Sequence, residues 1–167
     1  MQTKRDNLSL GSAGLGTGTT GATIKTTLPF GYQIAGRAYS KAATDNIPFN
    51  IRVMSPAELP INVPANRTQV YFVMIDAAGN LFYTQGRKSV ADAGVLRGLP
   101  GSSTAANYQA TAVEWPLEEN NFAVIGAIKV ATNAAGAMVP GTTLFSAANQ
   151  TVTYYNVGED YGVAIPV

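Results

Sequence analysis

The sequence contains no histidine and no cysteine. Histidine is the commonest general base and metal ligand in proteins, and cysteine supplies thiolate nucleophiles, zinc ligands and disulfides. Their absence excludes serine–histidine–aspartate and cysteine–histidine catalysis, thiolate zinc centres and a disulfide framework. We therefore expect a protein that is not an enzyme and that has no catalytic residue, no metal site and no cofactor.

Charged side chains are also scarce. They make up 13% of the 167 residues, about half the usual share, whereas hydrophobic residues make up 46%. The net charge of +1 gives no electrostatic reason to expect binding to nucleic acid or to a membrane. Exposed surfaces normally need charge for solubility. The composition therefore suits a chain that is partly covered by copies of itself or by another protein.

Long apolar runs are missing as well. No run approaches the roughly 18 residues that a membrane-spanning helix requires. Lys4 and Arg5 near the start are not followed by an apolar stretch, so the sequence predicts no signal peptide.

The first 27 residues are rich in glycine, serine and threonine. Such a segment buries too little apolar surface to offset its loss of conformational entropy, so residues 1–27 are expected to form an extended arm that docks on neighbouring subunits. Residues 28–167 are expected to form a single domain that folds without residues 2–21. The arm residues expected to contact the capsid or another subunit are Lys4, Arg5, Leu8, Leu10, Leu15 and Ile24.

Two later segments show the clearest strand patterns. Residues 68–85 read as a hairpin with a turn at Asp76–Asn80, and its first strand is apolar on both faces. Residues 122–131 read as one long strand, followed by another at 151–157. With a strict period of two, the larger side chains of the long strand share one face: Phe122, Val124, Ile128 and Val130, together with Gly126.

Shorter strands are expected over residues 32–35, 37–39 and 49–54, with turns at Gly36 and at Asp45–Asn46. One short helix is expected over residues 89–98. Many strands separated by turn residues, with at most one short helix, indicate an all-β fold. We expect an antiparallel β-sandwich or a jelly-roll-like barrel with an extended N-terminal arm.

The remaining polar and aromatic residues leave two other functions open. Tyr154, Tyr155 and Tyr161 could stack on sugar rings, although tyrosines in strands are more often half-buried. Glu118–Glu119 and Glu159–Asp160 are adjacent carboxylate pairs, whereas a glycosidase needs two carboxylates facing each other across a cleft. Adjacent side chains in a strand point to opposite faces, so solvated corners are the simpler interpretation.

The order of several segments resembles that of small structural proteins of tailed bacteriophages, the head decoration or cement proteins produced alongside the major capsid protein. The resemblance covers about residues 30–157. The segments that carry it are Phe72–Asn80, Thr84–Gly86, Leu99–Pro100, Ile125–Val130, Val139–Thr143 and Tyr154–Val157.

The resemblance implies a β-sandwich or jelly-roll-like module on the outer surface of the virion, made in the host cytoplasm. The expected partners are the major capsid protein and further copies of the chain in a symmetric homo-oligomer, with a trimer favoured and a dimer as the alternative. The expected function is to stabilise the head by cross-linking neighbouring capsid subunits. The alternatives are a receptor- or carbohydrate-binding module of a tail or head fibre and a carboxylate-dependent hydrolase that uses Glu118 or Glu159.

Overall fold

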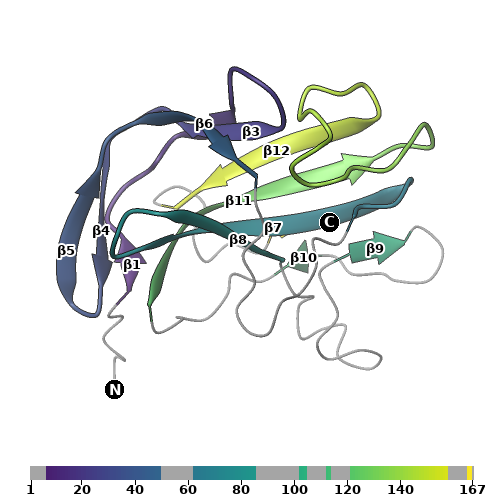
Figure 1. Cartoon of the computed structure of the whole chain (residues 1–167). Coiled ribbons are helices and arrows are strands. Elements are labelled where there is room, and N and C mark those ends of the chain that lie inside the picture. Colours follow the sequence, from purple (N-terminus) through teal and green to yellow (C-terminus); the bar gives the residue numbers. More distant parts are fainter. Residues whose placement is uncertain are drawn as a thin grey trace.

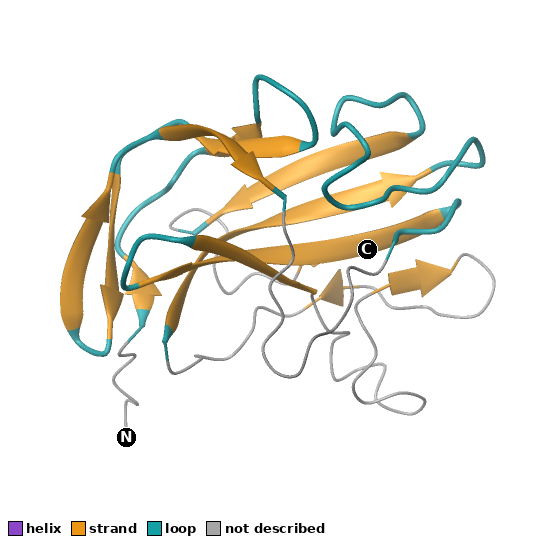
Figure 2. Ribbon diagram, in the orientation of Figure 1, coloured by secondary structure: helices purple, strands orange, loops and turns teal. Residues whose placement is uncertain are grey.

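The computed structural model describes residues 7–49, 62–85, 102–104, 112–113, 121–157 and 165–166. Within these ranges the chain forms strands and no helix (Figures 1 and 2), which confirms the all-β prediction. The helix expected over residues 89–98 lies outside the described ranges. The strands are β1 (Leu8–Ser9), β2 (Leu15–Thr17), β3 (Thr23–Thr26), β4 (Phe30–Ile34), β5 (Arg37–Lys41), β6 (Thr44–Pro48), β7 (Arg67–Asp76), β8 (Leu81–Gln85), β9 (Ser102–Thr104), β10 (Ala112–Val113), β11 (Phe122–Thr132), β12 (Gln150–Asn156) and β13 (Ile165–Pro166).

The largest sheet has the order β12-β11-β7-β8, and β9 pairs with β7 further along the β8 side. All of its pairings are antiparallel. The hairpin predicted over residues 68–85 is confirmed as β7 and β8, and the long strand predicted over residues 122–131 is confirmed as β11. Alternate residues of β7 contribute to two separate buried clusters, so this strand is covered on both faces, as its continuous apolar sequence predicts.

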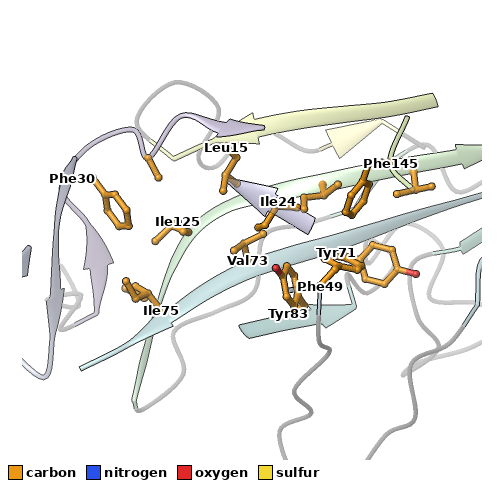
Figure 3. Packing of buried hydrophobic residues seen from close by; sticks show 14 of the residues in the cluster. Leu15, Ile24, Phe30, Phe49, Tyr71, Val73, Ile75, Tyr83, Ile125 and Phe145 are labelled. Atoms are coloured by element: carbon orange, nitrogen blue, oxygen red, sulfur yellow. The ribbon is translucent and has the colours of Figure 1, made fainter. Parts of the chain in front are cut away.

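Two smaller antiparallel sheets come from the first third of the chain, in the orders β1-β4-β5 and β2-β3-β6. They pack against one face of the largest sheet and enclose the main core between the layers, an arrangement consistent with a β-sandwich (Figure 1). Figure 3 labels the larger side chains of this core: Leu15, Ile24, Phe30, Phe49, Tyr71, Val73, Ile75, Tyr83, Ile125 and Phe145.

Residues 7–27 are part of this fold, which corrects the expected extended arm. Strand β1 pairs with β4, and β2 and β3 pair with each other and with β6. Leu15 and Ile24 are buried in the main core, and the Leu15 N–H donates a hydrogen bond to Asn156 Oδ1 at 2.8 Å. The segment is poor in apolar residues, yet Ala13, Leu15 and Ile24 are buried in the main core. Its backbone groups are satisfied by strands of the same chain.

A β-bulge in β11 corrects the strict alternation expected for this strand. Val124 lies opposite Met74, but Gly126 lies opposite Val73, so Ile125 is an extra residue in β11. One extra residue reverses the faces of all residues that follow it. Ile125 and Ile128 therefore both point into the main core, although a period of two places them on opposite faces.

The turn expected at Gly36 is confirmed between β4 and β5, where Ala35 and Gly36 have φ angles of 48° and 77°. The turn expected at Asp45–Asn46 is wrong, because both residues lie inside β6. Asn46 does adopt a left-handed φ of 54°, a conformation in which asparagine is found more often than most residues. The strand expected over residues 49–54 lies almost wholly outside the described ranges.

Candidate functional site

Exposed apolar side chains are the first functional signal in the described part of the chain. Three large hydrophobic residues are exposed there: Leu10 at 57%, Leu28 at 48% and Leu144 at 49%. Leu10 and Leu28 lie close to the start of β4. The Leu10 N–H donates to the Gly31 carbonyl at 2.9 Å, and the Leu28 N–H donates to the Ala13 carbonyl at 3.2 Å. The backbone therefore holds both leucines in place while their side chains remain in solvent.

An open hollow of about 400 Å³ lies beside these leucines on the sheet formed by β1, β4 and β5. Its lining residues are Pro29, Phe30, Gly31, Ser40, Lys41 and Ala42.

The outward face of β4 explains the hollow. Phe30, Tyr32 and Ile34 alternate into the core, so Gly31 points away from it. A Cβ on Gly31 would stand 3.7 Å from both Cβ and Cδ1 of Leu10, so Leu10 lies against a position that has no side chain. We call Leu10, Leu28 and the residues lining the hollow the Leu10–Leu28 surface.

Lys41 supplies the positive charge at this surface. Its Nζ donates a hydrogen bond to the Gly79 carbonyl at 2.9 Å and so ties β5 to the turn between β7 and β8. The Asp76 carboxylate shapes that turn, because its Oδ1 accepts the N–H groups of Ala78 and Asn80 at 2.9 Å each. Lys41 thus lines the hollow while its ammonium group is held at the turn between β7 and β8.

The core beneath the hollow is rigid and aromatic. Tyr32 stacks on Tyr39 with ring centroids 5.4 Å apart and lies 6.0 Å from the ring of Phe30. Burial raises the pKa of Tyr32, and the nearby negative charge of Asp76 raises it further. Tyr32 therefore remains neutral at physiological pH.

This surface presents exposed apolar side chains. Within the described ranges no group of three or more His, Cys, Asp or Glu side chains could hold a metal ion. Two exposed leucines beside a shallow hollow fit a protein partner that presents apolar side chains, and Lys41 can additionally bond a carboxylate.

The structure places the predicted arm contacts in three different environments. Leu10 is exposed and Leu8 is half-buried in β1, so Leu10 is well placed for contact with another protein. Lys4 and Arg5 lie outside the described residues. Leu15 and Ile24, which were also expected to contact other subunits, are buried within their own chain and are not available for such contacts.

Sequence reasoning missed Leu28. It precedes Pro29, between two short strands, and was assigned to neither the arm contacts nor the core. An isolated apolar residue at such a junction is a weak signal, because a linker leucine can turn inward or outward. Its exposed fraction of 48% in the structure shows that it remains outside.

The tyrosines proposed for sugar binding do not form one platform. Tyr154 packs against the main core, and its hydroxyl is 2.8 Å from Thr17 Oγ1. Burial raises the pKa of Tyr154, while the hydrogen bond to Thr17 lowers it. Tyr155 packs instead against the buried cluster on the other face of the largest sheet. Tyr161 and the carboxylate pairs Glu118–Glu119 and Glu159–Asp160 lie outside the described residues.

No helix in the described ranges is long and apolar enough to cross a membrane. No protein-family model matches the chain, and no curated protein or solved structure matches it either.

Proposed function

We propose that this protein decorates the head of a tailed bacteriophage. In this role it binds the outside of the major capsid protein lattice as a symmetric homo-oligomer and stabilises the shell by cross-linking neighbouring capsid subunits. Three features support the proposal: the resemblance of residues 30–157 to decoration proteins, the low share of charged residues and the β-sandwich architecture.

The Leu10–Leu28 surface is the observation that carries the proposal. Both leucines keep about half of their surface in water, which is unfavourable unless a partner covers them. A specific protein contact buries about 1,600 Å² in total, and a lattice repeats that contact many times by symmetry. Weak apolar contacts of this kind can therefore reinforce a shell collectively.

Substituting both leucines tests the proposal. We expect the double variant L10D/L28D to fold normally, because both side chains are exposed, and to bind at least about tenfold fewer copies per head than the wild type. The matched control is L144D, because Leu144 is similarly exposed, at 49%, but lies in the segment between β11 and β12. The readout is the number of copies per particle after co-sedimentation with purified phage heads.

Two results would contradict the proposal. One is that the wild-type protein does not co-sediment with heads at all. The other is that L10D/L28D and L144D bind as many copies as the wild type, which would exclude the Leu10–Leu28 surface. Recovery of the wild-type protein with tails rather than heads would favour the fibre alternative.

A further inference from the structure

The outer strand β12 of the largest sheet offers a pairing edge. In the part of the chain that the structure describes, β12 pairs with β11 alone and ends the sheet on that side (Figure 1). Strand β2 reaches β12 through side chains: the Leu15 N–H bonds Asn156 Oδ1, and the Thr17 hydroxyl bonds the Tyr154 hydroxyl. These contacts lie on the core face, and among the described strands none pairs with the backbone edge of Val152 and Tyr154.

The hydrogen-bond pattern shows which backbone groups point outward. The Val157 N–H bonds the Ile125 carbonyl at 3.2 Å, and the Asn133 N–H bonds the Asn149 carbonyl at 2.9 Å. Bonded and non-bonded pairs alternate along an antiparallel ladder, so Thr151, Thr153 and Tyr155 are the residues of β12 that bond β11. The N–H and C=O groups of Val152 and Tyr154 point away from the sheet.

This edge lacks the features that normally prevent pairing with another molecule. Natural sheets protect their edges with charged residues, proline or bulges. Strand β12 is seven residues long and contains no charge and no proline, and its register with β11 is regular.

Two other described edge strands carry such protecting residues. Strand β5 carries two positive charges, Arg37 and Lys41, and β6 contains Asp45 and Pro48. The opposite edge of the largest sheet is divided between two short strands, β8 and β9.

We propose that β12 pairs antiparallel with β12 of a second copy of this chain, so that two largest sheets join into one continuous sheet across a two-fold axis. The geometry favours one register. In this register Val152 of each copy lies opposite Tyr154 of the other. The outward-facing N–H and C=O groups of these two residues then form hydrogen bonds with the other copy. The uncharged strand can meet its own copy without like-charge repulsion, whereas β5 cannot.

In this register Thr153 lies opposite Thr153 of the other copy, and Thr151 lies opposite Tyr155. Both threonines are exposed in the single chain. A pair of threonines and a pair of β-branched and aromatic residues are both favourable across strands. The interface does not depend on attachment to capsids and can be tested with the purified protein alone.

Single cysteines test the register, because the chain has none of its own. In T153C the two cysteines face each other with Cα atoms about 4.5 Å apart, within reach of a disulfide. In T151C the two cysteines are displaced by four residues along the strands, about 13 Å, which a disulfide cannot bridge. We expect most of T153C, and little of T151C, to run at twice the monomer mass on a non-reducing gel.

The oligomeric state gives an independent test that needs no cysteine. Sedimentation velocity of the wild type should show a dimer, and T153K should dissociate it because two lysines would face each other across the axis. T151K is the control, because its lysine would face Tyr155, and it should remain dimeric. A wild-type monomer or trimer, or equal cross-linking of T153C and T151C, would overturn the proposal.

Discussion

Gly126 lies directly against Leu15, so that a Cβ at position 126 would overlap Cδ1 of Leu15. The same Cβ would also overlap the carbonyl oxygen of Tyr155 on β12. Gly126 follows the bulge in β11, and Leu15 belongs to β2, so this contact joins the N-terminal strands to the centre of the largest sheet. The absence of a side chain at one position thus allows the two layers to approach.

Replacing Gly126 with alanine should destabilise the protein. We expect G126A to lower the free energy of unfolding by about 2 kcal/mol or more, because the added methyl group overpacks a site where one neighbour is backbone. Urea denaturation measures the change. G11A is the control, since a Cβ on Gly11 meets no atom within 4 Å. Equal stability of G126A and the wild type would show that β2 does not pack on β11 in this way.

The N-terminal strands should contribute directly to stability. Ile24 is fully buried, and truncation of such a side chain costs about 2 to 5 kcal/mol, so I24A should unfold at a much lower urea concentration than the wild type. L28A provides the comparison, because Leu28 is 48% exposed and its truncation should change stability by less than about 0.5 kcal/mol.

Deletion of residues 2–21 extends this prediction to the whole segment. The deletion removes β1 and β2 together with the buried Leu15, so we expect loss of cooperative unfolding, measured by circular dichroism on heating. A truncated protein with the wild-type melting temperature would restore the original expectation of a dispensable arm.

Thr19 should control the pKa of Asp45. The hydroxyl and backbone N–H groups of Thr19 both donate to the Asp45 carboxylate and, with the Asn46 N–H, lower its pKa. We expect T19V to raise the Asp45 pKa, measured by carboxyl-carbon NMR titration, because the largest single contribution is the side-chain bond from Thr19. T20V should leave it unchanged, since Thr20 bonds Asn46 instead.

The direction of this shift also fixes its effect on stability. A carboxyl group with a lowered pKa in the folded state stabilises the protein above its unfolded pKa, near 4, and this stabilisation is lost as the pH falls through the folded value. T19V should therefore lose less stability on acidification than the wild type. An identical acid dependence in both proteins would contradict a role for this hydrogen bond.

Local patterns predict only part of the candidate site. Leu10 is one of six arm residues that the sequence predicts as contacts, but the same prediction includes Leu15 and Ile24, which are buried. The hollow beside it lies next to Leu10 only because β1 pairs with β4, a pairing between distant residues that no local pattern specifies. Leu28 and Lys41 belong to the site only in the folded protein. Lys41, for example, is held in place by its bond to the turn between β7 and β8.

Local sequence patterns were enough to predict the all-β class, the hairpin of β7 and β8 and the long strand β11, because alternating or continuous apolar runs and turn residues act over short distances. The place of residues 7–27 and the faces of β11 beyond Ile125 depend instead on contacts between distant segments. Leu15 lies against Gly126 and Asn156, which are more than 100 positions away in the sequence. Likewise, the bulge is defined by the pairing of β11 with the distant strand β7, so the residues around Ile125 do not reveal it by themselves.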